Sequence, residues 1–326
     1  MQGYILRRIL LTIPTLLAVT ILTFLFLRVL LPADVIDLII GQAGQSDPGL
    51  RPMLERELGL SGNKVGQYLN WIGLNWFWGG EKGILQGDLG RSLFSGKPVV
   101  EELKTRVPVS LELGLWGQLT SIAFSVPLGI WAALRQDKLP DYGLRSLAIL
   151  MTSVPGFWIA VLILTFGSIW FEWAPPIEFK YLWEDPLDHL RIMLLPALII
   201  GLTPSGALVR LVRTQMLEVL RQDYVRTARA KGLRESTVLY RHALRNALIP
   251  IVTVIGISLP NIIAGTVIFE QIFIIPGMGR YLVEAVNSLD YPVVQGLNLI
   301  FAFLLVVSVL LVDISYAFLD PRIRFR

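Results

Sequence analysis

Six strongly apolar stretches without charged residues divide this chain, and polar segments of unequal length separate them. Each stretch is long enough to cross about 30 Å of hydrocarbon as a helix that rises about 1.5 Å per residue. The pattern leaves little room for a large soluble domain. We therefore predict an all-α membrane protein whose six transmembrane helices cover residues 9–27, 113–134, 146–171, 192–209, 247–269 and 293–312.

The polar segment Leu217–Pro250, between the fourth and fifth stretches, has its own helical pattern. Its apolar positions recur every three or four residues on both sides of Gly232, which predicts two short helices joined at that glycine. The segment holds seven Lys and Arg residues against three acids. A basic, helical loop at the membrane surface indicates a docking element for a soluble partner. The two stripes are Leu217, Leu220, Tyr224 and Ala228, and Thr237, Tyr240, Leu244 and Leu248.

The composition narrows the possible chemistry. Of the 326 residues, 54% are hydrophobic and none is cysteine, so disulfides, thiolate metal sites and cysteine nucleophiles are excluded. The two histidines, His189 and His242, lie outside the predicted spans. We therefore predict no catalytic residues, no metal site and no cofactor bound by this chain.

The positive charge follows the predicted topology. If the N-terminus is cytoplasmic, seventeen Lys and Arg residues lie on the inner side, nine of them between Arg210 and Arg245. The short outer loops hold only Lys180, Arg191 and Arg280. This bias predicts that both termini are cytoplasmic, and it explains the net charge of +4 without nucleic acid.

The chain is expected to have two parts. Residues 1–107 form the first span with an external segment, and residues 108–326 form a five-helix core with a cytoplasmic loop over 212–246. The external segment contains three tryptophans within Trp71–Gly80. Such a cluster is typical of the membrane–water interface, but a buried aromatic patch fits it equally well.

Prolines interrupt several predicted spans. A proline leaves a backbone carbonyl without its helical partner, and neighbouring groups or a watery cavity must satisfy it. A tolerated kink is one interpretation, and a bend that lines a translocation path is the other. The candidate path residues are Pro155, Phe157, Trp158, Pro204, Ser205, Pro260 and Asn261.

The predicted spans have no central carboxylate, because Glu112 and Glu270 lie near span ends. Proton- or sodium-coupled carriers usually keep ionisable groups within the membrane. Intramembrane hydrolases need paired acids, a Ser/His set or metal ligands there. A carrier that works without an ATPase and an intramembrane enzyme therefore remain as weaker alternatives to a pore moved by another subunit.

Two motifs resemble a known family. YVRTARAKGL and RHALRNALIP, at 224–233 and 241–250, are similar to the cytoplasmic "EAA" loop of binding-protein-dependent ABC importer permeases. The acidic first position of that motif is Arg226 here, a departure that favours the dipeptide/oligopeptide/nickel branch. The loop from Pro276-Gly277 to Asp290-Tyr291-Pro292, and GDLGRS at 87–92, also resemble this branch. The opening residues are similar to the first member of its usual permease pair.

The resemblance implies a type I ABC importer permease bundle in the inner membrane of a prokaryote. It implies a heterodimer with a second, homologous permease. It also implies two cytosolic ATPases that use ATP and Mg²⁺, and an extracytoplasmic peptide-binding protein. Di- or oligopeptides are the implied substrates, with nickel chelates, glutathione or another small solute as alternatives. The residues implied to contact an ATPase are Tyr224, Arg226, Thr227, Ala228, Arg229, Lys231, Gly232, Leu233 and Arg234.

Overall fold

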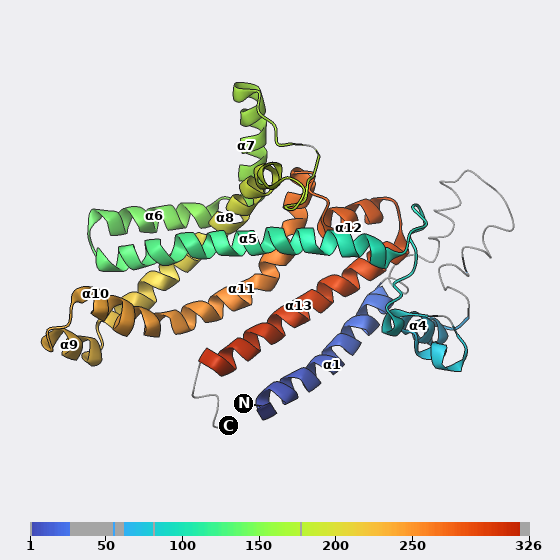
Figure 1. Cartoon of the computed structure of the whole chain (residues 1–326), viewed down its shortest axis with the longest axis horizontal. Helices are drawn as coiled ribbons and strands as arrows, with labels where there is room; N and C mark the ends of the chain where they lie inside the picture. Colours follow the sequence, from blue (N-terminus) through green and yellow to red (C-terminus); the bar gives the residue numbers. More distant parts are fainter. Residues whose placement is uncertain (1, 27–54, 56–61, 81, 177, 320–326) are drawn as a thin grey trace. The chain divides into compact units, whose positions relative to one another are not determined.

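The computed structural model describes residues 2–26, 55, 62–80, 82–176 and 178–319. Much of the predicted external segment, and the side chain of Asn261, lie outside the described residues. The described part is helical, with no β-strand and one isolated bridge between Arg91 and Pro98. Among the described residues, five helices are long and apolar enough to cross a membrane, and one bent helix pair is a sixth candidate (Figure 1). The predicted all-α membrane fold is confirmed.

The chain forms two compact units. Unit 1 comprises Val109–Pro276 and the chain from Leu311, and unit 2 comprises Gln2–Pro108 and Gly277–Leu310. The predicted domain boundary after residue 107 lies beside the boundary at Pro108. The segment 277–310, which we assigned to the five-helix core, falls in unit 2.

Unit 1 contains most of α5 (Val99–Leu134) and all of α6 (Leu139–Ser153), α7 (Gly156–Phe171), α8 (Pro186–Leu220), α9 (Asp223–Ala230), α10 (Glu235–Thr237), the π-helix η4 (Val238–Leu244) and α11 (Arg245–Ile272). Unit 2 contains α1 (Gln2–Leu25), α4 (Lys64–Ile72), the short 3₁₀ helices η2 (Leu74–Trp78) and η3 (Ile84–Gln86), α12 (Met278–Asn287) and most of α13 (Tyr291–Leu319).

The third predicted span is broken at Pro155. α6 ends at Ser153, α7 begins at Gly156, and the two helices are bent by 88° (Figure 1). Val154 is extended, as expected for the residue before a proline, and Pro155 has no N–H to continue the helix. The proline therefore causes a break between two helices rather than a kink within one.

Glycines bring α8 close to its neighbours. α6 runs back alongside α5 and packs on α8 (Figure 1). A Cβ on Gly206 would overlap the backbone oxygen of Ala148 in α6, and a Cβ on Gly201 would overlap the backbone oxygen of Gly117 in α5. Ser125 of α5 also donates a hydrogen bond of 3.1 Å to the carbonyl of Ser205. The small residues thus allow α5 and α6 to approach α8 closely.

Gly206→Ala is expected to lower the thermal stability of the protein in detergent. The new methyl group must move a helix backbone rather than a flexible side chain, which costs about 1–3 kcal/mol. Gly143→Ala in α6 is the matched control, because no atom lies within 4 Å of that Cβ. The control should be neutral or slightly stabilising, since alanine is the better helix former. Equal melting temperatures for both variants would contradict the close approach of α6 and α8.

In unit 2, two hydrogen bonds to Asp290 join the loop before α5 to the loop before α13. Ser92 Oγ donates a hydrogen bond of 2.5 Å to Asp290 Oδ2, and the backbone N–H of Leu93 donates to Asp290 Oδ1 at 3.2 Å. The two motifs GDLGRS and DYP are therefore parts of one structure. Beneath them lies an apolar cluster from α5, α12 and α13, formed by Val99, Leu103, Met278, Ala285, Val293 and Leu297.

Tyr281 of α12 lies at the edge of this cluster. The guanidinium of Arg106 lies 4.1 Å from the centre of its ring. Burial, together with the nearby charge of Glu102, raises the pKa of Tyr281 to about 12. The phenol is therefore neutral at any physiological pH, and the contact with Arg106 is of the cation–π kind.

Asp290→Ala is expected to reduce thermal stability by about 1–3 kcal/mol, because two donors in a nearly buried site lose their acceptor. Asp88→Ala is the control, since Asp88 accepts only an exposed hydrogen bond from the N–H of Gly90. Melting curves of the purified variants measure the difference. If Asp290→Ala melts with the wild type, the hydrogen bonds of Asp290 do not stabilise unit 2.

The predicted aromatic cluster divides into two environments. Phe24 of α1 contacts the rings of Tyr68 and Trp71 in α4, and Thr20 shares a hydrogen bond of 2.8 Å with the hydroxyl of Tyr68. Trp76 in η2 is exposed instead. Trp71 therefore fits the interpretation as an aromatic patch, whereas Trp76 fits the interfacial one.

Candidate functional site

A sharp turn at Gly232 shapes the cytoplasmic loop after α8. α9 ends at Ala230, and Gly232 follows with φ +76°, in the left-handed region. Its N–H donates to the carbonyl of Arg229 at 2.9 Å, which closes the end of the helix. No atom lies within 4 Å of the Cβ position of Gly232. The glycine is therefore required by its backbone conformation and not by crowding.

One face of α9 packs inside the loop. Val225 and Ala228 are buried against Val238 at the start of η4, with Val219 and Leu220 of α8 at the edge of this cluster. Tyr224 was expected on the same stripe as Ala228, yet it is 43% exposed. The reason is that α8 ends at Leu220 and α9 starts at a new angle, so the periodicity of α8 does not continue through the turn.

The other face of α9 is exposed. Of the nine residues predicted to contact an ATPase, Ala228 is buried and the other eight are exposed. Arg229 donates two hydrogen bonds to Glu235 across the turn, the shorter at 2.7 Å, and this contact raises the pKa of Arg229. The eight exposed residues are Tyr224, Arg226, Thr227, Arg229, Lys231, Gly232, Leu233 and Arg234.

The second predicted helix of the loop is the start of α11. From Glu235 the chain runs through α10 and the seven-residue π-helix η4 into α11 without a break. A π-helix closes its hydrogen bonds from residue i to i+5, so the 3.6-residue pattern shifts along it. Tyr240, expected on the apolar stripe, is exposed for this reason, and the buried positions are Val238, Leu239, Ala243, Ala247 and Ile251.

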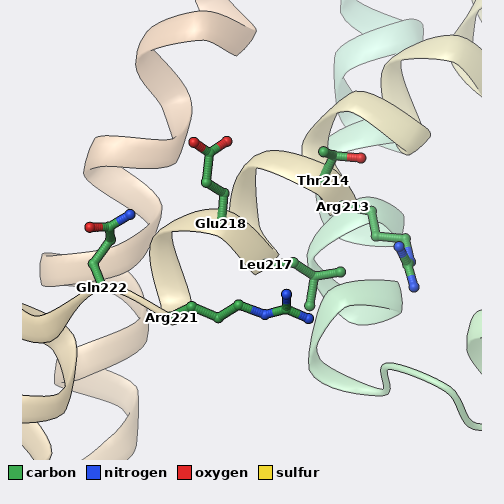
Figure 2. Close-up of a pocket in the computed structure, with 6 residues that line it drawn as sticks. All are labelled: Arg213, Thr214, Leu217, Glu218, Arg221 and Gln222. Atoms are coloured by element: carbon green, nitrogen blue, oxygen red, sulfur yellow. The ribbon is translucent and has the colours of Figure 1, made fainter.

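A cavity of about 450 Å³ lies along the last turns of α8, directly before α9. In Figure 2, Arg213, Leu217 and Arg221 point toward the green ribbon of the α5–α6 turn, whereas Glu218 and Gln222 point away from it. Arg221 reaches Gln136 in that turn at 3.5 Å. The end of α8 is thus adjacent to both α9 and the α5–α6 turn.

The candidate path residues do not all come together. Gly156, beside Pro155, approaches Thr203 of α8 and Phe269 of α11, which places the break after α6 near Pro204. Ser205 is fully buried and donates to the carbonyl of Leu202 at 2.6 Å, so it packs within the helix layer. Phe157 and Trp158 are exposed on α7, Pro260 is half-buried in α11, and the side chain of Asn261 is not described.

The sequence missed the pairing of two ionisable groups in unit 1. α8 begins at Pro186, so His189, which precedes the predicted span 192–209, lies in the first turn of the helix that carries this span. Its Nε2 lies 2.8 Å from Glu112 Oε1, and its Nδ1 lies 2.8 Å from the carbonyl oxygen of Lys180. The apolar run that located the span begins only at Ile192, which is why the earlier turn was overlooked.

A second missed feature is Glu270, which is fully buried near the end of α11. Its Oε1 accepts hydrogen bonds from Ser110 at 2.7 Å and Thr266 at 2.8 Å. Within the described residues, no group of three or more His, Asp and Glu residues could hold a metal ion. Glu270 thus lies near a helix end, and its hydroxyl partners come from α5 and α11.

Comparison with known proteins identifies the class. The family model of the binding-protein-dependent transport system inner membrane component matches residues 125–325, more than half of the chain and all of the cytoplasmic loop. The chain belongs to this family. It is therefore a transport permease subunit and not an enzyme. Permeases of this family work with ATPase subunits and a binding protein.

Three relatives of this permease match along their full length. A putative peptide transport system permease protein of Brucella abortus is 41% identical over 325 residues, and both chains are covered completely. The oligopeptide transport system permease protein AppB of Bacillus subtilis is 36% identical over 329 residues, with both chains again covered completely. The dipeptide transport system permease protein DppB of Escherichia coli is 37% identical over 349 residues, with the same coverage.

The fold of the permease agrees with its family. The methionine ABC transporter MetNI, in an inward-facing conformation, matches with a TM-score of 0.55 over 69% of this chain and 99% of that chain. The identity is 12%, so this match shows the fold alone. The predicted type I ABC importer permease fold is confirmed.

Proposed function

We propose that this permease forms the translocation pore of an ATP-driven importer for di- or oligopeptides. The observation that supports the substrate class is the full-length identity of 36–41% to permeases named for peptide transport in three organisms. Nickel chelates, glutathione or another small solute in the same branch form the alternative. An ATPase-independent carrier is disfavoured, because the buried acids described above lie at helix ends.

The proposed complex has several partners. A second, homologous permease completes the pore as a heterodimer, two cytosolic ATPases bind ATP and Mg²⁺, and an extracytoplasmic binding protein delivers the peptide. The assembly lies in the cytoplasmic membrane of a prokaryote. Residues 1–107 add the first span and the external segment to the core formed by 108–326.

The loop 212–246 is proposed as the contact to an ATPase. Its exposed surface is mixed in character, since Tyr224 and Leu233 are exposed apolar side chains beside the cations Arg226, Lys231 and Arg234. Apolar anchors surrounded by charges are typical of protein interfaces. Ala228 contributes from inside, because it fixes α9 against Val238.

The proposed translocation path passes the break at Pro155. A helix end leaves backbone groups without helical partners, and such groups are tolerated at membrane depth only where protein or a watery cavity satisfies them. The path residues are proposed to be Pro155, Phe157, Trp158, Pro204, Ser205, Pro260 and Asn261.

Co-purification tests the proposal. This chain is expressed with the ATPase and permease genes nearest to it, and ATP hydrolysis is measured with a binding protein loaded with di- or oligopeptide. A stable complex with peptide-stimulated hydrolysis is expected. A complex that ignores peptide would replace the substrate class with another solute. Transport into liposomes without any associated ATPase would replace the importer with the carrier.

A further inference from the structure

An ion pair connects α8, the helix that leads into the loop with α9, to α6. Arg213 of α8 donates from Nε to Asp141 Oδ1 and from a terminal nitrogen to Asp141 Oδ2, both at 2.6 Å. Asp141, in the first turn of α6, is fully buried, and the side chain of Arg213 is 16% exposed. This bidentate geometry fixes both the distance and the orientation between the two side chains.

Asp141 also organises the turn between α5 and α6. The N–H of Asp137 donates to Asp141 Oδ2 at 3.0 Å, and Asp137 has φ +60°, which is unfavourable for a residue with a side chain. The single carboxylate of Asp141 therefore holds three segments: the end of the α5–α6 turn, the start of α6 and the cytoplasmic end of α8.

Arg213 lies close to the end of α8 that leads into α9. α8 continues for seven residues after Arg213, about 10 Å of helix, and only Arg221 and Gln222 separate α8 from α9. α8 also packs on η4 and the start of α11 through an apolar cluster that includes Val212, Met216, Ala243 and Ala247. A force on α9 therefore reaches η4 through Val238 and reaches α8 through the chain at Arg221 and Gln222, and the ion pair with Asp141 is a charged, directional contact from α8 to α6.

We propose that Asp141 and Arg213 form a positioning pair. The pair transmits movement of the loop that contains α9 to the hairpin formed by α5 and α6. The inference rests on the proposed function, because it assigns the route by which ATPase closure reaches α6, and through Pro155 the break before α7. A buried ion pair is a weak source of stability compared with apolar packing of equal volume. It is well suited to hold one geometry while helices move as a unit.

The test is the ratio of peptide imported to ATP hydrolysed by the complete importer in proteoliposomes. Asp141→Asn keeps the shape of the side chain but removes its charge, and it is expected to lower this ratio by about tenfold. Hydrolysis per assembled complex should stay close to that of the wild type. The control is Asp188→Asn, which weakens exposed ion pairs to Lys180 and Arg191 at the opposite end of α8 and should leave the ratio unchanged.

A second variant covers the case in which Asp141→Asn does not assemble. Arg213→Lys keeps the positive charge but cannot form the bidentate contact, so it should assemble and lower the ratio by a smaller factor. The exchange Asp141→Arg with Arg213→Asp should restore part of the ratio. An unchanged ratio in Arg213→Lys, or in an assembled Asp141→Asn, would overturn the inference.

A distance measurement separates transmission from stability. The chain has no cysteine, so two cysteines can be introduced for spin labels at the exposed positions Leu139→Cys and Thr214→Cys. With cysteine-free partner subunits, the distance between the labels reports only α6 and α8 of this subunit. The distance should be the same with and without trapped ATP in the wild type and should change with ATP in Asp141→Asn. A constant distance in both would overturn the inference. Absence of ATP-driven peptide uptake by the wild type would instead remove the proposed function.

Discussion

Gly232→Val is expected to abolish most ATP-driven uptake while the protein still inserts into the membrane and assembles. The residue has φ +76°, and a β-branched side chain in the left-handed region costs about 1–3 kcal/mol. The turn relieves this strain by changing its conformation, which moves Leu233 and Arg234 relative to α9. We expect uptake per complex to fall by about tenfold or more.

Gly232→Asn separates the backbone requirement from the loss of a small residue. Asparagine adopts the left-handed conformation more readily than other side chains, and the space around the Cβ position is open. This variant should retain most of the uptake. Wild-type uptake in both variants would remove Gly232 from the mechanism. An equal loss of uptake in both variants would assign the effect to the added side chain instead of the turn.

Leu233→Asp is expected to release the ATPase subunits from the permease. Leu233 is 42% exposed directly after the turn, and a carboxylate placed in an apolar contact must lose its hydration. Loss of one central interface residue costs about 2 kcal/mol or more, which lowers the affinity by roughly thirtyfold. Co-purified ATPase, measured per permease, is the readout.

The matched control for Leu233 is Leu139→Asp. Leu139 is a strongly exposed leucine at the α5–α6 turn, on the same cytoplasmic side as the predicted loop but outside the proposed contact. ATPase recovery should stay near that of the wild type. If both variants keep the ATPase, Leu233 is not an anchor of the interface. If both lose it, the contact extends beyond the loop 212–246.

The main features of the site were readable before the structure because they depend on local chemistry. Gly232 stands between two helical patterns, and a glycine after a helix predicts a left-handed turn, which the structure contains. The exposed cations of the loop also follow from their spacing on a helix. The inward positions Val225 and Val238 did not follow, because they depend on the angle at which α9 folds back onto η4.

The break at Pro155 shows the limit of an apolar count. Residues 146–171 contain enough apolar side chains for one span, and hydropathy carries no information on helix direction. The proline indicated a disturbance there, but only the packing of Gly156 against Thr203 and Phe269 sets a bend of 88°. The π-helix before α11 is similar, since no composition signal marks a change in hydrogen-bond register.

The sequence by itself determined that this protein is a multispanning helical membrane protein with a basic cytoplasmic loop, and the resemblance of its motifs indicated a permease. The length of apolar stretches, the distribution of charge and the residues of turns are local features, so they can be recognised without knowledge of the fold. Only the tertiary structure decided which distant groups meet. Arg213 and Asp141 are 72 residues apart, and Ser92 and Asp290 are 198 apart. Such pairs depend on how the helices pack against one another. No local pattern in a single sequence shows which distant residues will meet.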